Sequence, residues 1–96
     1  MTGLTVVAKV VAQTEYVARV KSELLKLIAP TRKEDGCIEY NLHQDNDDPA
    51  VFIFYETWEN MASLEQHMHT DHFKSYVDAV ATMIKDKTVH KMTRIE

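Results

Sequence analysis

Two adjacent segments with the periodicity of β-strands constrain the fold of this 96-residue chain more than any other feature. In CIEYNLHQ, residues 37–44, apolar and polar side chains alternate, which is the period of a strand with one apolar face. The segment VFIFYETW, residues 51–58, is rich in β-branched and aromatic residues. The intervening DNDDP, residues 45–49, has the composition of a turn. The two segments are therefore predicted to pair as an antiparallel hairpin.

A strand and a helix are predicted before this hairpin. The segment LTVVAKVVA, Leu4–Ala12, is rich in β-branched residues and carries one charge, which predicts a strand buried on at least one face. Thr14 is then expected to cap a helix. Its apolar stripe consists of Val17, Val20, Leu24 and Ile28. Because Pro30 disfavours helical backbone at Ala29, the helix is expected to loosen there, and Gly36 closes the connection.

Two shorter helices and a last strand are predicted after the hairpin. Asn60 can cap the first of these helices and Thr70 the second. Their apolar positions are Met61, Leu64 and Met68 in the first helix and Phe73, Val77, Val80 and Ile84 in the second. The segment TVHKMTRI, residues 88–95, is the expected final strand.

The order of these elements is strand, helix, strand, strand, helices and strand, which is a doubled βαβ unit. The simplest closure is an α+β, ferredoxin-like βαββαβ fold, in which a four-stranded antiparallel sheet carries its helices on one face. A chain of 96 residues rarely divides further, so residues 1–96 are expected to form a single domain.

Several predicted strands carry apolar side chains on both faces. Val7 and Val11 alternate with Val6 and Val10, and both faces of residues 51–55 are apolar. The helices cover only one face of such a sheet, and a large exposed apolar patch usually marks a partner surface. A homodimer packed sheet against sheet, as in dimeric α/β barrels, is therefore expected.

Composition argues against several functional classes. The net charge of −4 is spread along the chain, whereas nucleic-acid binding usually requires a basic patch. No apolar run approaches the roughly 18–20 residues that span a bilayer, and the N-terminus lacks a secretion signal, so no membrane partner and a cytoplasmic location are expected. With two glycines and one cysteine, the chain has no phosphate-binding loop or paired-cysteine motif, and no cofactor is expected.

Three of the five histidines, His67, His69 and His72, form the pattern H-x-H-x-x-H, which resembles a set of metal ligands. Zinc needs three or four side chains that converge at about 2.0–2.3 Å from the ion. In one continuous helix His67 and His69 would lie about 200° apart around the axis. If the helix breaks at Thr70, the rings lie on different segments and their convergence has to be demonstrated. No metal site is therefore predicted.

Trp58 and His67 suggest a pocket instead. Trp58 ends a strand and His67 ends the next helix, so both are predicted to border the space between helices and sheet, with Phe73 and Tyr76 as further walls. A histidine in such a pocket can take up a proton at neutral pH. The alternative is that Trp58 belongs to the core and that His67 only interacts with the dipole of its helix.

Two polar residues of the predicted hairpin also have two interpretations. Glu56 lies in an apolar strand, where a carboxylate must be paired, hydrogen-bonded or raised in pKa. It is either a catalytic acid or base, or a structural anchor. Asn41 is either a donor in the pocket or a solvent-facing residue. The pattern of residues leaves both alternatives open.

The segments GCIEYNLHQD, DDPAVFIFYETWEN, LEQH and TDHF resemble the antibiotic biosynthesis monooxygenase (ABM) family, including its quinol monooxygenase-like members. The resemblance extends from the first strand to the last. Its most specific part is the E-x-W of Glu56 and Trp58, followed by His67 and the pair His72–Phe73. It implies a dimeric ferredoxin-like protein with a pocket between sheet and helices in each subunit.

The resemblance also implies an activity. Several family members oxidise quinol or phenol-like aromatics with molecular oxygen and use neither metal nor flavin. An ionised hydroquinone can reduce oxygen itself, so the protein has to bind it, remove a proton and shield the intermediate. His67 is then the first candidate for the base, and His72 is the alternative. The substrate-binding residues would be Trp58, Phe73, Tyr76 and Asn41.

Other activities occur on the same fold. One alternative is an isomerase or small-carbonyl enzyme, in which His67 and Glu56 would move protons without oxygen. Another is a non-catalytic dimeric module for binding or stress response.

Overall fold

The computed structural model describes residues 3–96 and contains one four-stranded sheet. Its elements are β1 Leu4–Ala12, a 3₁₀ turn at Thr14–Tyr16, α1 Val17–Arg32, β2 Cys37–Gln44, β3 Val51–Trp58, α2 Met61–Met68, α3 Asp71–Ala79 and β4 Ile84–Met92. No helix among these residues has the length and apolar character needed to cross a membrane.

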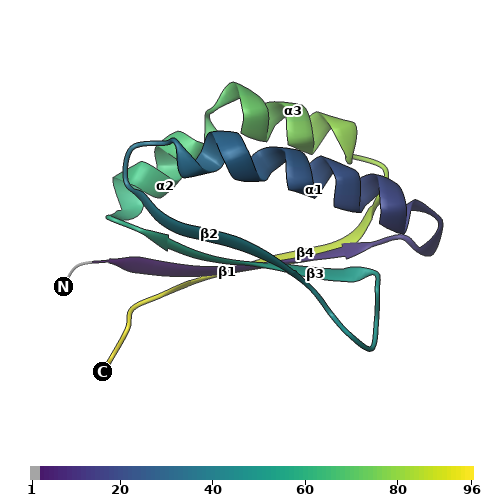
Figure 1. Cartoon of the computed structure of the whole chain (residues 1–96), viewed down its shortest axis with the longest axis horizontal. Helices are drawn as coiled ribbons and strands as arrows, with labels where there is room; N and C mark the ends of the chain where they lie inside the picture. The colour runs from purple at the N-terminus through teal and green to yellow at the C-terminus, as the bar shows by residue number, and fades with distance from the viewer. Residues whose placement is uncertain (1–2) are drawn as a thin grey trace.

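The four strands are antiparallel and lie in the order β2-β3-β1-β4. All the helices lie on one side of this sheet, so the molecule has two layers (Figure 1). This arrangement confirms the predicted ferredoxin-like α+β fold. The edge strand β4 pairs only with β1, and the helices pack mainly over the other strands.

The predicted hairpin is confirmed with its bounds. Tyr40 lies opposite Glu56, and Leu42 lies opposite Phe54. In the turn, the Asp45 carboxylate accepts hydrogen bonds from two backbone amides, at 3.0 Å from Asp47 and 2.7 Å from Asp48. An Asp at the start of a turn satisfies backbone donors in this way, which is why the DNDDP composition predicted a turn.

The core lies between the sheet and the helices. In β3 the buried side chains are those of Phe52, Phe54, Glu56 and Trp58, so every second residue faces the helical layer. From α1 the buried residues include Val20, Leu24 and Leu27.

The opposite face of the sheet is not covered by a helix of residues 3–96 (Figure 1). The alternation in β3 puts Val51, Ile53 and Tyr55 on this face, and Tyr55 keeps 42% of its surface exposed. The sheet-to-sheet homodimer stays a prediction that follows from this apolar surface.

The ends of α1 differ from the prediction. Thr14 caps no helix, because residues 14–16 form a 3₁₀ turn and α1 begins at Val17. The helix also continues through Pro30 to Arg32 instead of loosening at Ala29. A proline removes only one hydrogen bond from the last turn. The flanking residues Leu27 and Thr31 are both buried, and their packing keeps the turn helical.

The C-terminal segment also differs from the prediction. The cap residues are confirmed: Asn60 accepts a hydrogen bond from the Ser63 amide, and Thr70 accepts one from the Phe73 amide. However, α3 ends at Ala79, and Ile84 starts β4, which runs to Met92 rather than over residues 88–95. The reason is tertiary pairing, since Ile84 lies opposite Ala12 at the end of β1.

Gly36 positions the start of β2 against the start of α2. Its backbone has φ +84°, which L side chains rarely adopt, and an added Cβ would lie 2.1 Å from Ser63 Oγ. We expect Gly36→Ala to lower the free energy of unfolding by about 2 kcal/mol, because of the strained φ and the displaced Ser63. Urea unfolding of both proteins measures this difference. Equal midpoints and slopes would show that the loop relaxes without cost.

Candidate active site

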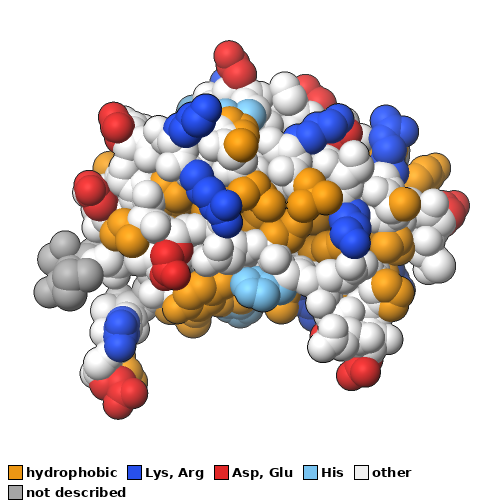
Figure 2. Space-filling view, viewed as in Figure 1, with side chains coloured by type: hydrophobic (Ala, Val, Ile, Leu, Met, Phe, Trp, Pro, Cys, Tyr) orange, Lys and Arg blue, Asp and Glu red, His pale blue; other side chains and the backbone are white. Residues whose placement is uncertain are grey.

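A cavity of about 780 Å³ lies between the sheet and the helices. Its inner wall is formed by side chains of β2, β3, α2 and α3, which are Tyr40, Phe54, Glu56, Leu64, His67, Phe73 and Tyr76. On the other side it extends to β4, including Lys87, Val89 and Lys91. Apolar surface is visible between the helical layer and the sheet, with Lys and Arg side chains spaced along it (Figure 2). The cavity therefore has apolar walls, a few buried polar groups and a charged rim.

His67 lies in the last turn of α2 and is 3% exposed. The Thr70 hydroxyl donates a 2.7 Å hydrogen bond to the His67 carbonyl oxygen, which turns the chain from α2 into α3. The imidazole ring is held between aromatic rings, with centroids 4.9 Å from Trp58, 4.9 Å from Phe73 and 5.6 Å from Tyr40. Its orientation is therefore set by packing on several sides.

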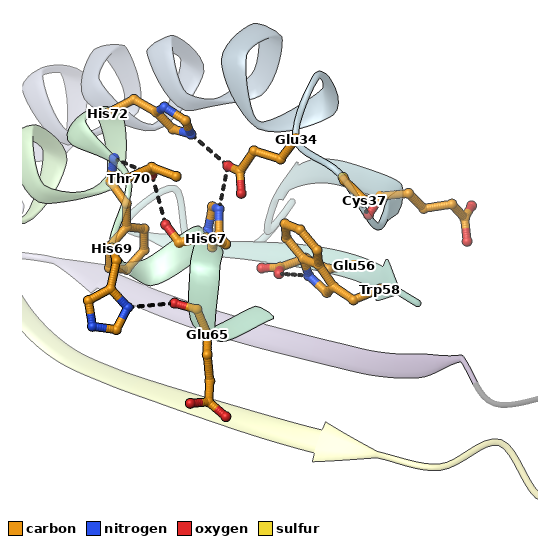
Figure 3. A network of polar contacts seen from close by, with 11 residues as sticks. Glu34, Cys37, Glu56, Trp58, Glu65, His67, His69, Thr70 and His72 are labelled. Carbon is orange, nitrogen blue, oxygen red and sulfur yellow. Dashed lines mark hydrogen bonds and ion pairs between the residues drawn. The ribbon is translucent and has the colours of Figure 1, made fainter. Parts of the chain in front are cut away.

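Glu34 binds His67 and His72 through one carboxylate oxygen (Figure 3). The distances from Glu34 Oε2 are 2.8 Å to His67 Nδ1 and 2.6 Å to His72 Nε2. An ionised carboxylate only accepts hydrogen bonds, so both ring nitrogens donate to it. His67 then carries a proton on Nδ1. In the neutral ring, Nε2 is left with a free lone pair.

Burial determines the charge of His67. Removal from water lowers the pKa of the imidazole below 6.5, although the Glu34 carboxylate opposes this shift. The ring is therefore neutral at pH 7. A neutral imidazole whose Nδ1 is held by a carboxylate is the arrangement of a general base.

Glu56 is the second buried polar group of the cavity wall, at 4% exposure. Burial raises its pKa to about 7, against the opposing effect of a 2.8 Å hydrogen bond that Trp58 Nε1 donates to Glu56 Oε1. The Glu34 charge raises it further. Near neutral pH this carboxyl group can both hold and release a proton.

The structure places Trp58 differently from the predicted pocket wall. The residue is fully buried, at 0% exposure, and does not line the cavity. It lies behind His67 and Glu56, packing against the first and hydrogen-bonding the second. Trp58 is the last residue of β3, and its ring packs against Tyr40 of β2 and His67 of α2. Phe73 and Tyr76 do line the cavity, as predicted.

Asn41 also lies away from the cavity. It is opposite Tyr55 in the hairpin, so its side chain is on the sheet face away from the helices. Its Oδ1 accepts a 3.1 Å hydrogen bond from Arg32 Nη2. The period of two in β2 determines this outcome, since Tyr40 takes the inward position. Asn41 is therefore no donor to a ligand in this cavity.

The three clustered histidines separate into two groups. His69 is exposed and bonds through Nδ1 to the Glu65 carbonyl oxygen at 2.7 Å. His67 and His72 converge on Glu34, and the three ligand atoms lie within 4.8 Å of one another. His72 borders a smaller hollow outside the main cavity, with Leu27 and Tyr76. These three residues could hold a metal ion only if the two shared protons were displaced.

Sequence reasoning missed Glu34 and Tyr40. Glu34 lies in the charged stretch TRKED, residues 31–35, at the end of α1, where no local pattern distinguishes it from its neighbours. Tyr40 could have been predicted as a wall residue. The alternation in β2 puts its neighbours Glu39 and Asn41 on one face of the sheet and Tyr40 on the other, which faces the helices.

Comparisons with known proteins agree on one family. The family model described as antibiotic biosynthesis monooxygenase matches residues 3–79. The chain is 31% identical over 87 residues to the Escherichia coli K12 protein named "Probable quinol monooxygenase YgiN", covering 80% of this chain and 84% of that protein. It is 32% identical over 68 residues to the uncharacterised Synechocystis protein sll1783, but spans only 46% of its length.

Solved structures show the same fold. The crystal structure of PA3566 from Pseudomonas aeruginosa superposes with a TM-score of 0.96 and 32% sequence identity. The match covers 100% of this chain and 97% of that one. The likeness therefore extends over every element described above.

Proposed function

Since the chain belongs to the antibiotic biosynthesis monooxygenase family, we propose that it oxidises a small quinol or phenol-like aromatic with molecular oxygen. The observation that carries the proposal is the position of His67. Its ring lines an aromatic cavity, its Nδ1 is held by Glu34 at 2.8 Å, and its Nε2 is the nitrogen left free to accept a proton. The name of the Escherichia coli relative supports a quinol as the substrate.

The proposed reaction begins with proton transfer from a quinol hydroxyl group to His67 Nε2. The resulting anion is electron-rich enough to react with oxygen, and the new imidazolium is stabilised by the Glu34 carboxylate. One oxygen atom enters the ring to give a hydroxyquinone, and the other leaves as water. The quinol supplies all four electrons, so the reaction balances without an added reductant.

Glu56 and the aromatic walls have separate roles in this proposal. Glu56, whose pKa is about 7, provides the proton with which the second oxygen atom leaves as water. Phe73 and Tyr76 hold the ring and exclude bulk water from the intermediate. His72 is a positioning residue, because it contacts Glu34 and lies outside the cavity.

Oxygen consumption with a panel of substituted hydroquinones tests the proposal. We expect uptake above the rate without protein, and a product from ¹⁸O₂ that carries one heavy oxygen atom. If no quinol gives uptake, the proposal is wrong. Turnover of a hydroxycarbonyl compound under argon would favour the isomerase, in which the same His67 moves a proton without oxygen.

Glu34→Gln tests the positioning of the base. An amide NH₂ can donate to His67 Nδ1 and so shift the ring proton to Nε2, which leaves no free lone pair toward the cavity. We expect kcat to fall about tenfold to a hundredfold, with little change in KM. Steady-state oxygen uptake over a range of pH measures both constants.

Glu65→Gln is the matched control for this variant. Glu65 is exposed on α2 and its carboxylate is not part of the cluster. Its replacement is expected to leave kcat unchanged. If Glu34→Gln also kept the kcat of the wild type, Glu34 would not orient the base.

A further inference from the structure

Four lysines line the cavity, Lys9, Lys85, Lys87 and Lys91, and two of them lie on the helical face of β4. In the pairing of β4 with β1, Lys91 lies opposite Val6 and Lys87 lies opposite Val10. Val6 and Val10 are 1% and 8% exposed, which places them on the face covered by the helices. Residues directly opposite in adjacent strands project to the same face. Lys87 and Lys91 therefore project to the helical side of the sheet, at the edge of the cavity.

These two lysines have no carboxylate partner among the residues that the structure describes. The ion pairs found in residues 3–96 involve Lys26, His67 and His72. The one acid of β4, Asp86, also lines the cavity, but no ion pair found in residues 3–96 joins it to either lysine. The rim is thus positively charged in a chain whose net charge is −4.

The sheet register sets how far the rim lies from the buried polar groups. Lys91, Val6 and Glu56 form one row across β4, β1 and β3. Neighbouring strands are about 4.8 Å apart, so the backbones of Lys91 and Glu56 are about 10 Å apart. Val89 lies between the two lysines and is opposite Ala8, so the surface between them is apolar. An aromatic ring beside Glu56 would have its far end near the lysines.

From this geometry we infer that the substrate is an aromatic with an anionic substituent, such as a carboxylate or sulfonate, at the end remote from the reacting hydroxyl group. The inference names the substrate class of the proposed function and rests on it. Lys87 and Lys91 attract the anion during entry and bind it at the rim. The apolar surface between them contacts the ring. A neutral quinol would lack the first of these interactions.

Lysines on an edge strand also have a second explanation. They prevent β4 from pairing with the edge of another sheet. That explanation requires nothing of a ligand, so it predicts no effect of either lysine on the affinity for anions. Binding of an unreactive probe pair separates the two explanations.

Naphthalene-2-sulfonate and naphthalene-2-sulfonamide form this pair, since they differ mainly in charge. Two partly exposed ion pairs contribute about 1.4 kcal/mol together, so we expect the sulfonate to bind about tenfold more tightly at low salt. In the double variant Lys87→Gln, Lys91→Gln the preference should fall below about twofold, with the affinity for the sulfonamide unchanged. Fluorescence titration of the naphthalene ring measures both dissociation constants.

Lys21→Gln is the matched control, because it removes the same charge from an exposed position on α1. It should keep the preference of the wild type. The inference is overturned if the wild type does not prefer the sulfonate, if the double variant keeps the preference, or if neither probe binds. Because binding is measured without turnover, a preference for the sulfonate together with no oxygen uptake would reject the proposed reaction alone.

Discussion

Replacing His67 by Gln is expected to lower kcat/KM for quinol-dependent oxygen consumption by about a thousandfold. Gln has a similar volume and can still hydrogen-bond Glu34, so the cavity is retained. Its amide cannot accept the substrate proton at neutral pH, so the quinol has to react in its weakly reducing, protonated form. The measurement is initial oxygen uptake with the best quinol of the panel.

The matched control for this variant is His69→Gln. His69 belongs to the same histidine cluster in the sequence, but it is exposed and bonded to the Glu65 carbonyl oxygen. Its replacement is expected to leave kcat/KM within about twofold of the wild type, as for most surface changes. Full activity of His67→Gln would show that another group is the base.

The pH profile gives an independent test of the same assignment. A general base works only in its unprotonated form, and burial lowers the pKa of His67 below 6.5. On the acid side, the rate is therefore expected to fall only as the pH drops through this lowered pKa. On the alkaline side it is expected to fall as Glu56, the proton donor with a pKa of about 7, becomes ionised. A rate that already falls as the pH drops from 8 to 7 would contradict the assignment.

Replacing Glu56 by Gln is expected to stabilise the protein at pH 8 by about 3 kcal/mol. The folded state raises the pKa of Glu56 from 4.5 to about 7, and each unit corresponds to about 1.4 kcal/mol. A raised pKa means that the folded protein favours the protonated acid. The stability that the protonated Glu56 contributes is therefore fully present below pH 4.5 and is lost as the pH rises toward 7. Gln removes this loss and still accepts the hydrogen bond from Trp58.

Urea unfolding at pH 4.5, 6 and 8 measures this effect as the difference between the two proteins. The difference should be small at pH 4.5 and reach its plateau above pH 7. Glu39→Gln is the control, because Glu39 is in the same hairpin but is exposed and bonds the Thr57 hydroxyl. If the stabilities of Glu56→Gln and the wild type changed in parallel with pH, Glu56 would have an ordinary pKa in the folded protein.

Local patterns predicted most of the secondary structure. The bounds of β1, β2 and β3 and the caps Asn60 and Thr70 agree with the structure, because alternation and capping depend on neighbouring residues. The errors are at the two ends of α1, where Thr14 caps no helix and Pro30 does not end the helix, and at the boundary between α3 and β4. Packing of Leu27 and Thr31 extends α1, and pairing with Ala12 moves β4 toward the N-terminus. Both depend on residues distant in the sequence.

The candidate site was predicted in part. The sequence identified His67, Glu56, Phe73 and Tyr76, which all line the cavity. It placed Trp58 in the wall, whereas the residue lies one layer behind it. It also left open whether Asn41 faces the pocket or the solvent. The register with β3 places Asn41 opposite Tyr55, on the face away from the helices.

Thus the sequence by itself determined most of the strand and helix segments, the fold class and the family, and its resemblance to that family, carried by Glu56, Trp58 and His67, pointed to His67 as the base. Only the tertiary structure brought Glu34 to His67 and His72, which are 33 and 38 residues away from it in the chain. A carboxylate in a loop has no local pattern that indicates its partner. The protonation state of His67 is set by that contact and by burial, and both exist only once the sheet and helices have packed.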